Sequence, residues 1–413
     1  MNENADDQPF ALSMWEFVTL TAFMMAITAL SVDVMLPVLP DIVEAFALGD
    51  PNKQQFMVTV YLGAFAIGHI FVGPLSDRVG RKPALLGGLL IYIVGSAMAI
   101  IAENYTMLLV ARAVQGLGAA GPRVVAVAIV RDRFVGRAMS QVMSFVMTVF
   151  IILPVIAPTI GATIGALGSW RYVFVVLLFF AAGTFLWTLI RMPETNPRTG
   201  PLARKPVSIR VALATICSNG QTVGYMLALG FIFGCLMTYI STTQQVFADI
   251  YGIVDWFPLV FASVAGMMIV SSFVNTRLVQ TWGMRRLSHG AILALMAASA
   301  LMWVGVEIFG TPHLSVLMVF LSLAFFLIGL VLPNFNALAM EPLGAIAGTG
   351  SSFVGFVMTG LGAVLGGAVG QLYDGTVYPL LGGFCLFSAM VVVIIYFAEG
   401  RKLMQPAATH PAE

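Results

Sequence analysis

A small set of ionisable side chains lies well inside long apolar runs of this sequence, and chemistry is expected there. The set is Asp33, His69, Arg112 and Arg123. An acid or arginine at such a position in a membrane costs roughly 2.5–3.5 kcal/mol on insertion scales, so it needs a partner or water. At 1.5 Å per helical residue, Asp33 and Arg112 both lie about 10 Å from the same membrane face. An ion pair between them is therefore geometrically allowed.

Asp33 is the side chain best suited to carry a proton. While it faces Arg112 it is expected to remain ionised, whereas separating the two, or drying the site, favours the protonated acid. Proton binding would then depend on conformation, as coupled transport requires. The alternative is a fixed ion pair that holds two helices together, with Arg112 as a counter-ion only. Gln115, one turn further on, could hydrogen-bond either partner or a substrate.

Arg123 and His69 lie closer to the other face. Arg123 is about 16 Å along the helix from Arg112, too far to share Asp33. It either extends toward the nearby water or gives an inner cavity a positive charge that favours anionic or zwitterionic substrates. His69 could titrate near neutral pH, but a lone histidine near a helix end is expected to be a hydrogen-bonded interface residue.

The composition of the sequence indicates the class of protein that contains these ionisable groups. Apolar residues make up 59% and charged residues 9% of the 413 residues, against about 45–50% and about 25% in soluble domains. The net charge of +1 gives no indication of nucleic-acid partners. The three cysteines lie in apolar runs without metal-type spacing, so neither a disulfide framework nor a metal site is expected. The sequence predicts an all-α, polytopic membrane protein.

Twelve apolar runs are each long enough to span a bilayer, which takes about 20 residues. An even number of spans places both ends of the chain on one side. Sixteen of the twenty Lys and Arg residues fall in the tails and connections on that side, which predicts cytoplasmic termini. The first ten residues contain no Lys or Arg, unlike a signal peptide. The predicted spans are 15–40, 54–76, 83–102, 106–130, 138–165, 169–191, 221–247, 256–279, 287–308, 313–335, 345–370 and 375–398.

The chain divides into two sets of six spans. A proline-rich connection with five basic residues in or next to it separates them, and the run from Phe273 to Arg286 weakly repeats the run from Phe71 to Lys82. Two repeated halves around a site at the membrane midplane are typical of transporters. The predicted parts are a tail at 1–14, a bundle at 15–191, a cytoplasmic linker at 192–220, a bundle at 221–398 and a tail at 399–413.

Several motifs resemble those of the major facilitator superfamily over nearly the whole chain. The loop Gly73-x-x-x-Asp77-Arg78-x-Gly80-Arg81-Lys82 resembles that family's first cytoplasmic loop, and Arg112-x-x-Gln115-Gly116-x-Gly118 resembles a motif of its drug:proton antiporters. Pro154-x-x-Ala157-Pro158-x-x-Gly161 resembles the antiporter motif of span five, with alanine where glycine is usual. Asp33 to Pro40 is most similar to the bicyclomycin/chloramphenicol-resistance subgroup.

The resemblance implies a conformational latch in the charged loop. Asp77 would pair with basic groups at the end of span four or eleven, supported by three basic neighbours, and would hold the cytoplasmic side closed. Exposed pairs contribute only about 0–1 kcal/mol each, so such a latch must act as a network. The residues assigned to it are Gly73, Asp77, Arg78, Gly80, Arg81 and Lys82.

Span five and the space between the halves complete the predicted transport machinery. Pro154 and Pro158 should kink span five, and Gly161 should let it pack closely against a neighbour. Flexible methionine and aromatic side chains suit the recognition of varied apolar compounds. The predicted cavity residues are Met25, Gln115, Arg123, Tyr239 and Gln244.

The function expected from these features is proton-coupled export of small, partly apolar drugs or metabolites across a bacterial inner membrane. The alternative is a uniporter or proton symporter that imports a metabolite. The sequence has no nucleotide-binding loop, so the energy source would be a proton gradient, with no cofactor. The absence of clustered catalytic groups argues against a membrane-embedded enzyme. The family resemblance implies a monomer.

Overall fold

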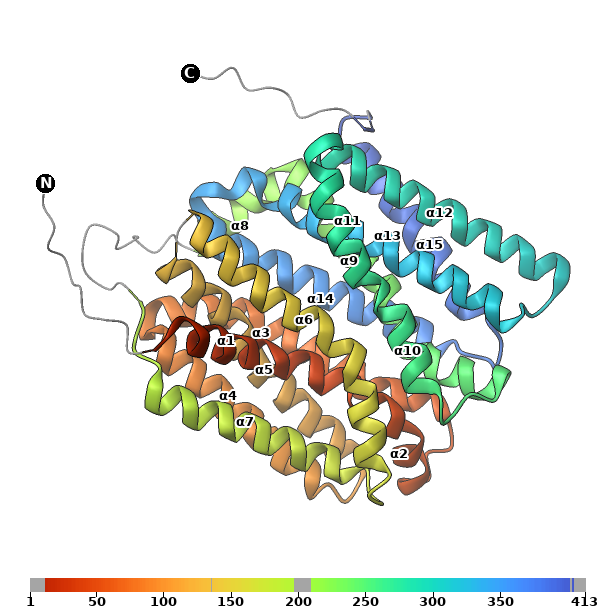
Figure 1. Cartoon of the computed structure of the whole chain (residues 1–413), viewed down its shortest axis with the longest axis horizontal. Helices are drawn as coiled ribbons and strands as arrows, with labels where there is room; N and C mark the ends of the chain where they lie inside the picture. The colour runs from red at the N-terminus through yellow and green to blue at the C-terminus, as the bar shows by residue number, and fades with distance from the viewer. Residues whose placement is uncertain (1–11, 135, 197–208, 402, 405–413) are drawn as a thin grey trace, which may run out of the picture.

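The computed structural model describes residues 12–134, 136–196, 209–401 and 403–404, and within these ranges the regular structure is helical (Figure 1). The first half contains α1 (Met14–Asp33), η1 (Leu36–Val38), α2 (Leu39–Ala45), η2 (Pro51–Gln55), α3 (Phe56–Val79), α4 (Arg81–Ile100), α5 (Tyr105–Arg133), α6 (Gly136–Gly165) and α7 (Arg171–Arg191). The second half contains α8 (Ile209–Ser218), α9 (Gly220–Gln245), η3 (Val246–Ile250), α10 (Phe257–Ala265), α11 (Met267–Trp282), α12 (Met284–Phe309), α13 (Leu314–Met340), η4 (Glu341–Ile346), α14 (Ala347–Gln371) and α15 (Tyr378–Ala398).

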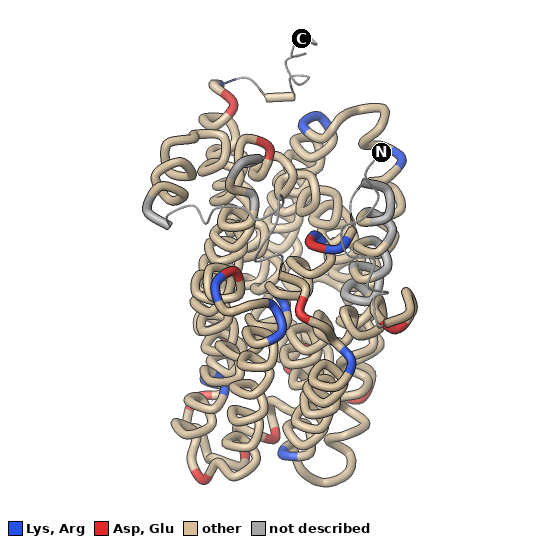
Figure 2. Tube along the Cα trace, turned by 90° about the vertical axis from the view of Figure 1, so that its left-hand side faces the viewer, with Lys and Arg blue, Asp and Glu red and all other residues tan. Residues whose placement is uncertain are grey.

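Eleven described helical segments are long and apolar enough to cross a membrane, and the ends of each lie within eight residues of those of a predicted span. The remaining predicted span is α6, of which Ile152–Gly165 is described as a shorter apolar helix. Most of the helical tube carries neither acidic nor basic residues (Figure 2). We call the face at which α1 begins and α15 ends the terminal face, and the other the opposite face.

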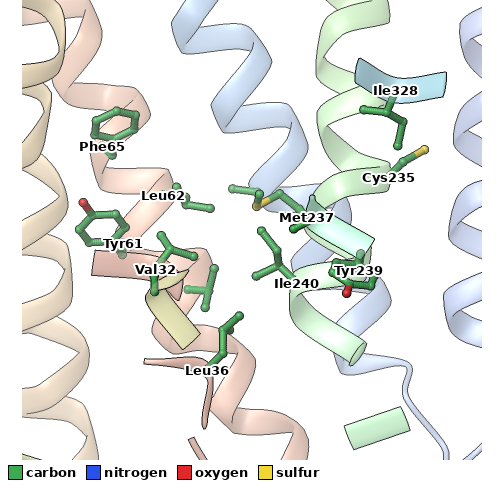
Figure 3. Close-up of a cluster of buried hydrophobic side chains, with 14 of the residues drawn as sticks. Val32, Leu36, Tyr61, Leu62, Phe65, Cys235, Met237, Tyr239, Ile240 and Ile328 are labelled. Atoms are coloured by element: carbon green, nitrogen blue, oxygen red, sulfur yellow. The ribbon is translucent and has the colours of Figure 1, made fainter. Parts of the chain in front are cut away.

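The helices form two groups, α1–α7 and α9–α15, that meet along a seam (Figure 1). In the seam α3 packs against α14, and α6 packs against α10. Glycines on α14 allow the close approach, because Gly355 lies against His69 and Gly367 lies against Thr59. At the centre, Leu62 and Val32 point toward Met237 and Ile240 of α9 (Figure 3). The middle of the seam is therefore largely apolar.

Two predicted spans are broken within their length, and one predicted connection contains a helix. Span one ends as an α-helix at Asp33 and continues through η1 and α2, because prolines at 37 and 40 cannot extend an α-helical ladder. Span eight is divided at Gly266 into α10 and α11. The connection predicted at 192–220 contains the helix α8.

The weak sequence repeat has a clear counterpart in the backbone. Gly80, between α3 and α4, has φ 111° and ψ 157°, and Gly283, between α11 and α12, has φ 75° and ψ 159°. Positive φ at such a tight turn favours glycine because it lacks a Cβ atom. The same turn therefore links the second and third spans of each half.

Candidate functional site

Asp33 lies where the first span breaks, a placement that its sequence position alone did not reveal. Its side chain is 4% exposed, and its Oδ1 atom has no hydrogen-bond partner among the described residues. Asp33 is the last residue of α1, so its carboxyl lies at the negative end of the helix dipole. A carboxylate is costly in such surroundings unless water, a cation or a proton neutralises it.

The expected ion pair between Asp33 and Arg112 is not formed in this structure, because the guanidinium is engaged elsewhere. Arg112, fully buried on α5, donates from Nη2 to the carbonyl oxygen of Ser31 at 3.0 Å and from Nε to that of Met57 at 3.0 Å. The Ser31 carbonyl is free because the amide of Met35 bonds to Val32 instead of continuing the α-helical ladder. Arg112 therefore caps the broken end of α1.

The polar network around Arg112 extends into two further helices. Nη1 of Arg112 donates to Gln115 Oε1 at 2.9 Å, and Gln115 Nε2 donates to Ser96 Oγ at 2.7 Å. The guanidinium also lies over the ring of Tyr61, 4.3 Å from its centroid. Arg112 and Gln115 of the predicted motif are thus brought together in one network. The first glycine of that motif, Gly116, lies directly against the Tyr61 backbone.

The span-five motif packs against the same break in span one. Gly161 of α6 lies against the carbonyl of Val34, the residue after Asp33, and Gly165 lies against Val38. A side chain at Gly161 would overlap that carbonyl. Pro158 and Pro154 lie within α6, about one and two turns before Gly161. The motif therefore supports the peptide that follows the buried acid.

The other predicted cavity residues are dispersed. Arg123 contacts the sulfur of Met25, which is fully buried on α1. Tyr239 packs between the rings of Phe261 and Phe325, on the side of α9 opposite to Met237 and Ile240 (Figure 3), and its assignment as a cavity wall stays a prediction. Met237 and Ile240 of the same helix point toward the seam (Figure 3).

His69 occupies the interface with α14, as expected, but it is not hydrogen-bonded there. Its side chain is 8% exposed, and neither ring nitrogen has a partner among the described residues. The Phe65 ring packs edge-on against its imidazole, and Gly355 lies on its other side. The helices pack so closely here that none of the described donors or acceptors reaches the imidazole nitrogens.

A cluster of amide side chains joins the halves at the opposite face, and the sequence analysis missed it. Asn52 Nδ2 donates to the carbonyls of Gln371 and Tyr373, at 3.3 and 2.7 Å. Gln245 Nε2 donates to Asn52 Oδ1 at 3.0 Å. Gln244, predicted in the cavity, instead accepts from Gln54 at 3.5 Å. The amide cluster consists of Asn52, Gln54, Gln55, Gln244, Gln245 and Gln371.

The charged loop at the terminal face is organised around Arg81 rather than Asp77. The Arg81 side chain is 6% exposed and pairs with Asp132 at 2.7 Å and with Asp77 at 2.5 Å. Asp77 therefore pairs within its own loop, and Arg81 provides the contact with the end of span four. Its guanidinium is close enough to satisfy both carboxylates, which explains the difference from the prediction.

Further contacts attach this loop to the rest of the terminal face. The Glu194 carboxylate accepts from the backbone amides of Arg81 and Lys82, at 2.8 and 3.2 Å, and so caps the start of α4. Gly73 packs against Ser352 of α14, in the other half. The loop is thus a contact point between three spans of the first half and one of the second.

Two packed helix groups of membrane-spanning length, with a broken first span and a repeated turn in each half, are the architecture of a membrane transporter. The sequence pattern of the Major Facilitator Superfamily matches residues 21–367, and the chain belongs to this family. It is a transporter and not an enzyme.

Relatives of known sequence or structure agree with this assignment. The chain is 30% identical to the uncharacterised MFS-type transporter YdgK of Bacillus subtilis, covering 90% of this chain and 92% of that one. It is 29% identical to a bicyclomycin resistance protein homolog of Haemophilus influenzae, covering 95% and 98%. The fold resembles the crystal structure of the human organic anion transporter MFSD10, with a TM-score of 0.68, 18% identity and coverage of 93% and 99%.

Proposed function

We propose that this protein exports small, partly apolar compounds across a bacterial inner membrane in exchange for protons, with both termini in the cytoplasm. The relationship to a bicyclomycin resistance protein homolog supports drug export as the direction of transport. The observation that carries the proposal is the buried Asp33 at the break of span one. It is the one acid of the sequence deep within a span.

In the proposed mechanism, Asp33 holds a proton in the conformation described here. No cation among the described residues pairs with it, and a buried unpaired charge is unfavourable. When the halves rock apart at the opposite face, water or Arg112 could stabilise the ionised carboxylate, and the proton would be exchanged. Arg112 is close in depth but is engaged with the carbonyls of Ser31 and Met57. Its release would then accompany the conformational change.

Proton release from detergent-purified protein tests this proposal. Chloramphenicol or bicyclomycin is added near neutral pH in weak buffer, and the pH change is compared between the wild type, Asp33→Asn and Asp41→Asn. Asp41 is an exposed acid of the same span and serves as the matched control. We expect release from the wild type and Asp41→Asn, and none from Asp33→Asn. Binding without release from any variant would contradict proton exchange and favour a facilitator.

A further inference from the structure

We propose that the transport path selects against positively charged compounds and accepts molecules that carry no positive charge and offer hydrogen-bond acceptors. This inference rests on the proposed export function and adds the chemical class of the substrate. It follows from the few charges that lie at depth and from the uncharged polar groups beside them.

The charges deep in the spans are one acid and two arginines, all in the first half: Asp33, Arg112 and Arg123. In α9–α15 every Asp, Glu, Lys and Arg lies in a connection or within six residues of a helix end. The span formed by α6 contains no acid anywhere in its sequence. The deep part of the path therefore carries a net positive charge whether Asp33 is ionised or protonated.

The order of these charges along the path strengthens the repulsion of a positively charged substrate that enters from the terminal face. Asp33 and Arg112 share one depth, whereas Arg123 lies eleven residues, about 16 Å, closer to the terminal face on α5. A substrate coming from that side meets the arginine before it meets the acid. Salt screens buried charges much less than exposed ones, so the potential persists in the path.

Uncharged polar atoms near these charges favour ligands that offer hydrogen-bond acceptors. Buried polar groups are normally hydrogen-bonded, yet Thr28 Oγ1 on α1 and Tyr61 Oη on α3 have no hydrogen-bond partner among the described residues. The ring nitrogens of His69 share this property. Thr28, Tyr61 and His69 are 8%, 0% and 8% exposed. A hydroxyl or an imidazole N–H can donate to a carbonyl, hydroxyl or carboxylate of a ligand, but none of these groups supplies a negative charge for a cation.

The first test measures the local potential directly and requires no known substrate. Thr28→Cys is placed in a chain whose three cysteines are replaced by alanine, and a chain retaining only the exposed Cys217 is the reference. Reaction rates are measured with an anionic sulfonatoethyl and a cationic trimethylammonioethyl methanethiosulfonate. We expect the anionic-to-cationic rate ratio at position 28 to be at least about tenfold above the reference. If Thr28→Cys does not fold, Met25→Cys replaces it.

Arginine variants show whether this ratio comes from the deep charges. Arg123→Gln should bring the ratio closer to that of the reference. Arg171→Gln should leave the ratio unchanged, because Arg171 lies at the opposite face and bonds to the carbonyls of Ile100 and Ala102. A ratio at position 28 equal to or below the reference overturns the inference.

A transport measurement then separates this inference from the proposed function. Proteoliposomes with an imposed pH gradient are supplied with chloramphenicol, which is uncharged, or with the cations ethidium and tetraphenylphosphonium. We expect proton-driven movement of chloramphenicol and at least about tenfold slower movement of the cations. Equally fast movement of the cations overturns the charge selection and leaves proton-driven export standing. No proton-driven movement of any of the three counts against the proposed function, while the thiol rates still decide the charge of the path.

Discussion

Gly161 of α6 lies against the backbone carbonyl of Val34, so that even a methyl group at position 161 would overlap that oxygen. Val34 directly follows Asp33 and lies in the turn that ends α1. The glycine of the span-five motif therefore acts on the same few residues as the buried acid and the Arg112 network. Span five is thus a support for the broken first span as well as a kinked helix.

The first prediction is that Gly161→Ala impairs both stability and transport. The added methyl group must displace either α6 or the turn after Asp33, and overpacking of this kind typically costs about 1–3 kcal/mol. We expect a lower Tm in detergent and a clear loss of export. Gly183→Ala is the control, because Gly183 faces open space on α7 and alanine favours a helix. An unchanged Tm and export rate in Gly161→Ala would show that this contact is not needed.

The second prediction concerns the shape of the Arg112 side chain. Its guanidinium donates to three acceptors at once, Ser31 O, Met57 O and Gln115 Oε1, in a fixed planar arrangement. Lysine keeps the charge but cannot reproduce this geometry. We expect Arg112→Lys to lower export by about tenfold or more, equivalent to about 1.4 kcal/mol. The measurement is drug export from proteoliposomes. Wild-type export by Arg112→Lys would mean that a point charge suffices, as for a simple counter-ion of Asp33.

Much of the fold could be predicted because it depends on local sequence. The apolar length of each span and the Gly80 and Gly283 turns are properties of short segments, and the structure contains them within a few residues. The proximity of Arg112 and Gln115 could also be predicted, because they lie one turn apart on one helix. The drug:proton-antiporter character and the roles of the site residues stay predictions.

The contacts that could not be predicted are those made between helices. Depth along a helix placed Asp33 and Arg112 together, but depth contains no information on rotation or on the break that frees the Ser31 carbonyl. The ring packing of Tyr239 against Phe261 and Phe325 could not be predicted for the same reason, since it depends on helix rotation. The amide cluster was missed because single Asn and Gln residues near helix ends look like ordinary loop polarity. Its hydrogen bonds join residues about 190 to 320 positions apart.

The third prediction is that Asp132→Asn is more damaging than Asp77→Asn. Both acids pair with Arg81, but the side chain of Asp132 is 13% exposed and that of Asp77 is 51% exposed. An exposed pair contributes about 0–1 kcal/mol, whereas loss of one partner from a buried pair costs more because a charge is left uncompensated. We expect a lower Tm for Asp132→Asn and little change for Asp77→Asn.

Kinetics should distinguish a latch from a purely structural cluster. If the loop controls the conformational change, Asp77→Asn lowers the turnover rate of export more than it weakens drug binding. Both are measured on the same proteoliposome preparation, with Asp374→Asn, an exposed acid at the opposite face, as the control. Equal losses of turnover and affinity in Asp77→Asn would contradict a latch.

The fourth prediction is that Asn52→Ala weakens closure at the opposite face. Asn52 hydrogen-bonds to Gln371, Tyr373 and Gln245, so one side chain connects η2 with the ends of α14 and α9. Alanine leaves these partners without their bonds, at about 0.5–1.5 kcal/mol each. We expect the halves to separate more often at that face. Spin labels on cysteines introduced at the exposed positions Lys53 and Leu372, in a chain lacking its native cysteines, should then show a larger population of long distances.

The character of these bonds gives the fourth prediction a second, independent outcome. The side chains of the amide cluster are all uncharged, unlike the Arg81 ion pairs that link spans of the first half at the terminal face. Salt weakens interactions between exposed charges and has little effect on amide hydrogen bonds. Raising the salt concentration should therefore leave the distance between the labels at positions 53 and 372 nearly unchanged in wild-type protein. A shift as large as that caused by Asn52→Ala would mean that charges, rather than amides, hold this face closed.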